Sequence, residues 1–139
     1  MAGVGTTREA VCACGGFKLS LQGDPSLVSA CCCTRCQRRT GSFFGVTAYF
    51  APEQLVKREG PASTFQRTAG GTVMHFCPTC GTSLLWMSEE WDDVIGVAGG
   101  AFADPTLPGP HRMTHTGTGH PFVTSPQGIP TYEGPPPED

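Results

Sequence analysis

The eight cysteines of this 139-residue chain fall into three short clusters, at 12–14, 31–36 and 77–80. Half of them stand in the six-residue stretch Cys31-Cys32-Cys33-Thr34-Arg35-Cys36. Cysteine sulfur binds metals, pairs in disulfides or acts as a nucleophile, and spacing helps to separate these uses. The first question is therefore which chemistry each cluster favours.

The outer two clusters favour a structural metal. A C-x-x-C pair followed by glycine, here Cys77, Cys80 and Gly81, is typical of a zinc knuckle, in which backbone amides point at the sulfurs. A knuckle supplies only two ligands. Cys12 and Cys14 can supply the other two, because residues i and i+2 of a strand project to the same face. We therefore predict a four-thiolate structural zinc site.

The central cluster favours an incomplete metal site. Cys31 and Cys33 face the same way in a strand, and Cys36 can turn back towards them after a bend. Three protein ligands and an open fourth position are usual for catalytic zinc. Cys32 points to the opposite side and is interpreted as a packed apolar thiol, with a ligand or nucleophile as the alternative.

Two other uses of the cysteines remain as alternatives. An even number of cysteines permits disulfides, but adjacent cysteines rarely bridge one another. A thioredoxin-like redox pair is disfavoured because no βαβ pattern surrounds either C-x-x-C. The N-terminal segment lacks the basic and apolar regions of a secretory signal, so we expect a cytoplasmic, reducing location in which metal binding is favoured.

Composition narrows the class of protein. The net charge is −3 and the pI about 5.7, which gives no reason to expect nucleic acid or an anionic membrane as a partner. No apolar run is long enough to span a bilayer. We expect one domain over 1–134 and a disordered, proline-rich tail over 135–139. A homodimer is left open.

The elements that must position the cysteines are predicted to be short strands. Glycine and proline together make up nearly a quarter of the residues, with 19 and 13 copies, which favours frequent turns over long helices. Alternating or apolar runs predict strands at 8–13, 16–22, 27–33, 44–50, 62–67, 72–77, 83–87 and 94–98, with a last one at 111–116. Helical turns are expected at 34–40, ending at Gly41, and at 52–55. The prediction is an all-β fold of sandwich or barrel type.

Together these clusters resemble a known family. The segments Cys12-Ala-Cys14-Gly15, Cys31-Cys32-Cys33-Thr34-Arg35-Cys36-Gln37-Arg38-Arg39-Thr40-Gly41 and Phe76-Cys77-Pro78-Thr79-Cys80-Gly81 look like the motifs of the glutathione-dependent formaldehyde-activating family, which includes centromere protein V-like domains. The later "VIGVAGGAFADP" and "IPTYEG" are similar to its closing strands. The resemblance covers about residues 10–134 and is more specific for fold and zinc than for the reaction.

The resemblance implies a fold of coiled antiparallel sheets with two zinc ions. Structural zinc would lie on Cys12, Cys14, Cys77 and Cys80, and a second, catalytic or labile zinc on Cys31, Cys33 and Cys36. At the second zinc the family's named enzyme joins glutathione and formaldehyde into S-hydroxymethylglutathione, which makes it a carbon–sulfur lyase. The chain departs from the family where Cys32 replaces a common histidine, and where His75 replaces a basic residue of another type.

Groups that would assist such a reaction are less well marked. A fourth thiolate at a three-thiolate zinc would need nearby positive charge, which Arg35, Arg38 and Arg39 could supply, although a solvated helical face is the simpler interpretation. Candidate proton donors are known by residue type only: His75, His111, His115 and His120. The alternatives to an enzyme are a non-catalytic, zinc-stapled binding module and a thiol- or zinc-based redox sensor.

Overall fold

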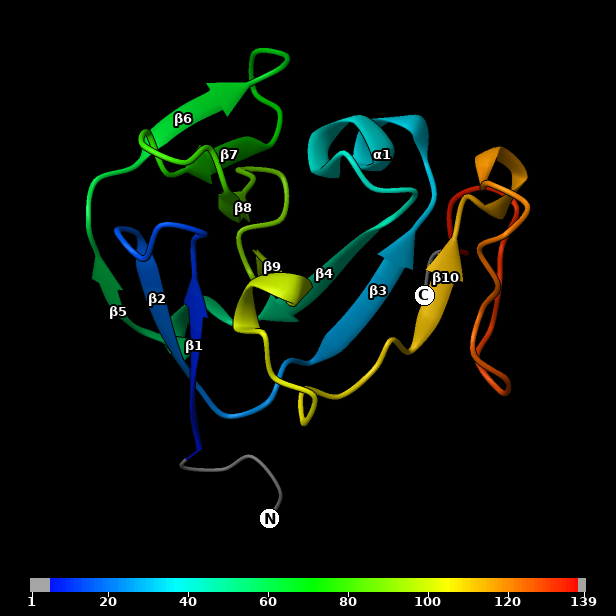
Figure 1. Ribbon diagram of the computed structural model, residues 1–139, viewed down its shortest axis with the longest axis horizontal. Helices are drawn as coiled ribbons and strands as arrows, with labels where there is room; N and C mark the ends of the chain where they lie inside the picture. Colours follow the sequence, from blue (N-terminus) through cyan, green and yellow to red (C-terminus); the bar gives the residue numbers. More distant parts are fainter. Residues whose placement is uncertain (1–5, 138–139) are drawn as a thin grey trace.

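Short strands, one short α-helix and three 3₁₀ turns are the regular elements of the computed structural model, which describes residues 6–137 (Figure 1). The strands are β1 (Thr7–Val11), β2 (Lys18–Gln22), β3 (Leu27–Cys31), β4 (Gly45–Phe50), β5 (Leu55–Glu59), β6 (Ser63–Gln66), β7 (Val73–Phe76), β8 (Ser83–Met87), β9 (Ile95–Ala98) and β10 (Arg112–Thr114). The helical elements are α1 (Thr34–Thr40) and the 3₁₀ turns η1 (Pro52–Gln54), η2 (Gly99–Phe102) and η3 (Thr116–Thr118).

The strands form two sheets. The smaller has the order β1-β2-β5 and the larger the order β10-β3-β4-β9-β8-β7-β6. All neighbours are antiparallel except β10, which pairs with β3 in parallel. Figure 1 shows why: from η2, near the centre of the view, the chain runs down and along the bottom of the molecule, so that it enters β10 from the same end at which β3 begins. The expected antiparallel β fold is confirmed, with this one parallel pair as the difference.

The two sheets pack face to face over one core. Ala10, Leu19 and Leu21 of the smaller sheet and Phe50 and Val97 of the larger belong to the same cluster of buried side chains. In β4 Ala48 and Phe50 are buried whereas Thr47 and Tyr49 are half-buried, as the pleat of a strand with one covered face requires, and in β2 all three central residues are buried. A second, smaller cluster lies under the C-terminal segment.

Most predicted elements are present, including α1 with the predicted boundaries. The helix is capped at its start by Cys33 and at its end by Gly41, whose left-handed backbone lets its N–H donate to the carbonyl of Gln37. The sequence prediction missed β5, η2 and η3. Strand β5 is exposed along nearly all of its length, so it lacks the apolar alternation that marks a half-buried strand; pairing with β2 holds it in place.

The remaining features of the fold are the C-terminal tail and the lengths of the helices. The predicted disordered tail at 135–139 lies partly outside the described residues, and 135–137 follow an irregular course. Within residues 6–137, no helix has the length and apolar character that crossing a membrane would need.

Candidate metal centres

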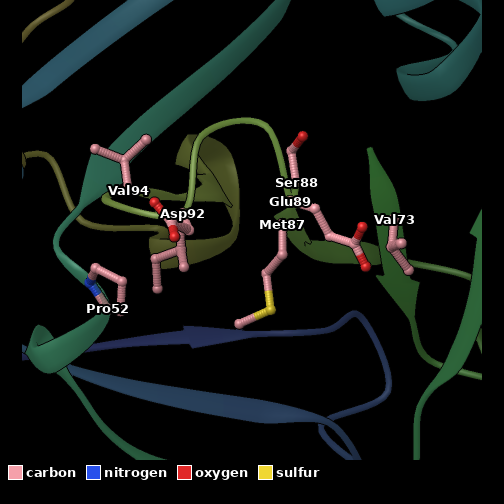
Figure 2. A pocket seen from close by; sticks show the side chains of 8 residues that line it. Pro52, Val73, Met87, Ser88, Glu89, Asp92 and Val94 are labelled. Atoms are coloured by element: carbon pink, nitrogen blue, oxygen red, sulfur yellow. The ribbon is translucent and has the colours of Figure 1, made fainter. Parts of the chain in front are cut away.

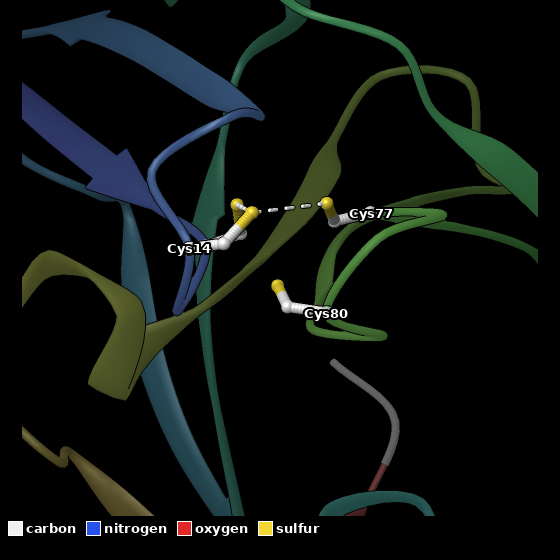
Figure 3. Close-up of side chains that lie close together, drawn as sticks. Cys14, Cys77 and Cys80 are labelled. Atoms are coloured by element: carbon white, nitrogen blue, oxygen red, sulfur yellow. Dashed lines mark hydrogen bonds between the residues drawn. The ribbon is translucent and has the colours of Figure 1, made fainter.

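The four outer cysteines meet where two turns from different sheets come together. Figure 3 shows Cys14 facing Cys77 and Cys80 across the gap between these turns. The sulfurs of Cys12, Cys14, Cys77 and Cys80 all lie within 4.8 Å of one another. Cys12 and Cys77 are buried, and their two partners are exposed. The structure therefore brings together the four residues that spacing had paired.

The geometric reason for pairing Cys12 with Cys14 was wrong in one respect. Strand β1 ends at Val11, so both cysteines lie in the following turn rather than in a strand. The turn is closed by hydrogen bonds from Gly15 N–H to the carbonyl of Cys12 and from Cys12 N–H to the carbonyl of Phe17. Gly15 takes a positive φ of 84° there, which costs glycine little.

The second turn is a knuckle that matches the first. Gly81 N–H donates to the carbonyl of Cys77 at 2.8 Å, and Cys77 N–H donates to the carbonyl of Thr82 at 3.0 Å. The Thr82 hydroxyl accepts from Ala13 N–H at 3.0 Å and lies 3.3 Å from Cys80 Sγ. Thr82 thus joins the two turns directly.

The distances between these sulfurs fit a tetrahedral thiolate site. Cys12 Sγ lies 3.7 Å from Cys14 Sγ, and Cys14 Sγ lies 3.6 Å from Cys77 Sγ. Four sulfurs at the zinc–sulfur bond length of about 2.3 Å would be about 3.8 Å apart. A disulfide needs about 2.05 Å, and all eight cysteines are free thiols. The donor set therefore suits zinc and not a disulfide pair.

Neighbouring thiols in this cluster cannot all ionise by themselves. Hydrogen bonds from the Thr82 hydroxyl and N–H lower the pKa of Cys80 to about 5. For Cys14, a hydrogen bond from Gly16 N–H lowers the pKa, but the neighbouring thiols of Cys77 and Cys12 raise it by more, so that the pKa is about 11. A divalent cation reverses this repulsion, since it favours thiolate on every ligand.

The three central cysteines meet where β3 ends and α1 begins. Cys31 is the last residue of β3, whereas Cys33, which was predicted to lie in the same strand, is the N-cap of α1. Cys36 lies in the first turn of that helix. Their sulfurs lie within 4.8 Å of one another, and each residue is half-buried. Cys33 Sγ also accepts the N–H of Cys36 at 3.4 Å, which is an ordinary capping contact.

Gly45 allows the helix to approach the sheet here. It is the β4 partner of Cys31, and a Cβ at this position would lie 3.3 Å from Cys36 Cβ and 2.7 Å from Arg39 Nη2. The side chain of Arg39 continues over the sheet, with its guanidinium carbon 4.4 Å from the ring centroid of Trp86. The absence of a side chain at Gly45 thus lets Cys36 lie beside Cys31.

Cys32 lies on the opposite side of the chain from this cluster. It is buried with Ala30 and Met113 in the second core cluster, and its N–H donates to the carbonyl of Thr114 at 2.9 Å. Burial raises the pKa of its thiol, and negative charge on Cys31 and Cys33 raises it further. These contacts agree with the interpretation of Cys32 as a packed thiol.

The central cluster also cannot ionise fully without a cation. A hydrogen bond from Cys36 lowers the pKa of Cys31 to about 4, despite the opposing effect of burial. The same contact, together with burial, raises the pKa of Cys36 well above its usual range. One thiolate and one thiol therefore share a proton in the metal-free cluster, and a bound cation would release it.

The side chain that sequence reasoning failed to select is His115. Its Nδ1 lies 3.4 Å from Cys31 Sγ and 3.2 Å from the hydroxyl of Thr114. The residue has a left-handed backbone, with φ at 57°, and its N–H donates to the carbonyl of Gly134. No signal in the sequence marks His115, because its position depends on the parallel pairing of β10 with β3.

The other candidate residues lie elsewhere or have other partners. His111 Nδ1 accepts the N–H of Val28, His75 contacts Arg58, and His120 stacks with two phenylalanines. Arg35 and Arg38 are exposed on α1, which fits a solvated helical face.

A cavity of about 330 Å³ lies beside the C-terminal end of β8, where Met87 and Ser88 line it. Figure 2 shows Met87, Glu89 and Asp92 in its lining, with Val73 and Pro52 at its sides. None of its lining residues is a cysteine or a histidine. It is therefore separate from the two clusters and carries none of the chemistry predicted for this chain.

Comparison with known proteins identifies the family whose motifs the three cysteine clusters resemble. A family model described as "Glutathione-dependent formaldehyde-activating enzyme" matches residues 7–118. A crystal structure of a Rhodobacter sphaeroides protein aligns with 88% of this chain and 98% of its own, with a TM-score of 0.58 and 16% sequence identity; at this identity it shows a shared fold only. No curated protein matches the chain significantly.

Proposed function

Because the chain belongs to the glutathione-dependent formaldehyde-activating family, we propose that it is a zinc-dependent carbon–sulfur lyase of the S-(hydroxymethyl)glutathione synthase type. The observation that carries this proposal is the three-sulfur cluster of Cys31, Cys33 and Cys36. Three ligands from the protein leave a coordination position for a substrate, which a closed four-thiolate site does not.

The two clusters take different parts in this proposal. Cys12, Cys14, Cys77 and Cys80 hold a structural zinc that ties the β1–β2 turn to the β7–β8 turn. Cys31, Cys33 and Cys36 hold the second zinc beside the sheet face that carries Gly45. When bound there, zinc would lower the pKa of a thiol at its open position, so that a thiolate is present at neutral pH.

The reaction itself makes one carbon–sulfur bond. The sulfur of glutathione adds to the carbon of formaldehyde, and the proton that the thiol loses ends on the oxygen of the product's hydroxymethyl group. No atoms are left over and no oxidant is needed. The chain's part is to hold the sulfur and the aldehyde together and to exclude competing water.

His115 is the histidine best placed to assist. Its Nδ1 is within hydrogen-bonding distance of Cys31 Sγ, and a donor there would orient this sulfur, as hydrogen bonds to metal ligands commonly do. Arg39 adds positive charge on the same side of the sheet, above Trp86. Both groups would offset the negative charge of three thiolates.

The test combines metal content with rate. We expect two zinc ions per wild-type chain and one per chain in Cys33→Ser. Because thiols add to formaldehyde without a catalyst, the rate of adduct formation must be measured by exchange NMR against a protein-free control. We expect a wild-type rate above this background, and a Cys33→Ser rate equal to it.

Cys32→Ser is the matched control, since it changes a neighbouring cysteine that faces away from the cluster. It should keep both zinc ions and most of the activity. Two zinc ions with no rate above background would contradict the enzyme proposal and favour the binding module. Release of one zinc by mild peroxide, restored by a reductant, would instead favour a redox sensor.

A further inference from the structure

One face of the large sheet continues the central cluster with polar side chains. In the β3–β4 ladder Cys31 pairs with Gly45 and Ser29 pairs with Thr47. In the β10–β3 ladder Arg112 pairs with Ser29. Paired residues project to the same face of a sheet, and so do residues i and i+2 of one strand. Arg112, Ser29 and Thr47 therefore form a row beside the cluster.

Arg112 is held in this row by a hydrogen bond. Its Nε donates to the hydroxyl of Ser29 at 3.0 Å, and Ser29 is buried, with 6% of its surface exposed. This contact uses one edge of the guanidinium and leaves the two terminal nitrogens for another acceptor. Arg112 itself is half-buried, so its charge is partly shielded from water.

Arg112 has no partner of opposite charge among residues 6–137, a property that it shares with Arg39 and with the exposed arginines, and it differs from the exposed arginines in being half-buried. Arg8 pairs with Asp24 and Asp104, and Arg39 lies over Trp86. Among the ion pairs found within residues 6–137, none includes Arg112. A half-buried guanidinium held on one side and unpaired on the other suits a carboxylate, which it can bind through two parallel hydrogen bonds.

Tyr49 shows that this row and the cluster share one electrostatic environment. Burial raises the pKa of its phenol, the positive charge of Arg112 lowers it, and negative charge on Cys36 and Cys31 raises it. Tyr49 lies on the same face, since it pairs with Leu27 two residues before Ser29.

The spacing sets the size of the ligand. Ser29 and Cys31 are two residues apart on β3, which places the row about 7 Å from the cluster. An extended peptide covers about 3.3–3.6 Å per residue. A cysteine thiol held at the cluster would therefore place the carboxylate of the next residue close to Arg112.

We propose that Arg112, fixed by Ser29, binds the terminal carboxylate of a peptide thiol in which one residue follows the cysteine. This deepens the proposed function and rests on it, because it assigns a substrate contact at the same site. Glutathione has this form, with glycine after its cysteine. A thiol without that carboxylate would bind less well.

The experiment is a calorimetric titration of zinc-loaded protein with glutathione and with its glycine monoethyl ester, which differs by one negative charge. We expect wild-type protein to bind glutathione about tenfold or more tightly than the ester, from the loss of a charge-assisted pair. Arg112→Gln should bind both equally and at the level of the ester. Arg112→Lys keeps the positive charge but cannot form two parallel hydrogen bonds, so its affinity for glutathione should lie between those of wild type and Arg112→Gln.

Arg67→Gln is the matched control, since it removes an exposed arginine from the β6–β7 loop and should bind as wild type does. Equal wild-type affinity for glutathione and its ester would overturn the proposal, as would no binding of either or a preference that survives in Arg112→Gln. The adduct rate is measured alongside. A preference for glutathione over its ester without an adduct rate above background would support the Arg112 subsite and reject the lyase. An adduct rate above background without that preference would support the lyase and reject the subsite.

Discussion

The two cysteine clusters are built in opposite ways from the same side chain. The outer cluster joins turns 63 residues apart, as measured between Cys14 and Cys77, and includes two buried cysteines. The central cluster uses three cysteines within six residues, at the junction of β3 and α1. One presents four sulfurs and the other three.

This difference separates stability from reactivity. A cross-link between distant turns removes much more freedom from the unfolded chain than a local one does. Loss of the outer metal should therefore unfold the protein. Loss of the central metal should leave the fold and remove only what happens at that site, because β3, α1 and their caps form from backbone hydrogen bonds and packing.

The largest effect should come from Cys77→Ser. We expect this variant to lose at least about 5 kcal/mol of unfolding free energy, because structural zinc contributes its binding energy to folding. Cys33→Ser should lose less than about 1 kcal/mol of unfolding free energy, because folding does not depend on the central metal. Urea unfolding followed by circular dichroism in zinc-containing buffer measures both. Equal losses in the two variants would remove the distinction between the clusters.

Chelation should separate the two metals in time. With a coloured zinc chelator we expect two phases of release, of about one zinc each, and at least about tenfold apart in rate, since the three-thiolate site can exchange its open position. The far-ultraviolet dichroism should stay constant through the fast phase and fall with the slow one. A single phase that coincides with unfolding would show that the clusters are not independent.

A smaller effect is expected from His115→Asn. Asparagine tolerates the left-handed backbone of this position but is too short to reach Cys31 Sγ as the histidine does. Loss of a hydrogen bond to a metal ligand typically lowers affinity or activity by 10- to 100-fold, and we expect about tenfold here. A shift of the thiolate-to-metal absorption band in cobalt-loaded protein checks that Cys31 is affected. An unchanged band and rate would assign His115 a merely local role.

The smallest effect concerns the central cluster after its metal is removed. The pKa of Cys31 is lowered to about 4 by the contact with Cys36, whereas that of Cys36 is raised. Between pH 6 and 8 Cys31 is already thiolate, so its alkylation by iodoacetamide should change less than about twofold. Alkylation of Cys36 should be much slower than that of Cys31 at every pH in this range, because its raised pKa keeps it as a thiol. Peptide mapping by mass spectrometry measures each rate.

Much of the fold followed from local patterns. The helix over Thr34–Thr40 ends at Gly41 as glycine and the preceding polar run indicated, and most strands lie where apolar residues alternate. Strand β5 could not be found this way, since Val56 and the charged residues after it are exposed. Its place comes from backbone pairing with β2, which leaves no mark on its own side chains.

Within each cluster, spacing alone indicated which cysteines could act together, because side-chain direction in a turn or strand depends on spacing of one to three residues. It thereby separated Cys32 from its neighbours. What surrounds the central cluster depends on long-range pairing: His115 contacts Cys31, and Arg112 lies on the same sheet face, because β10 pairs in parallel with β3. The paired residues are more than 80 positions apart in the sequence, and local periodicity does not indicate which distant strand will pair with β3.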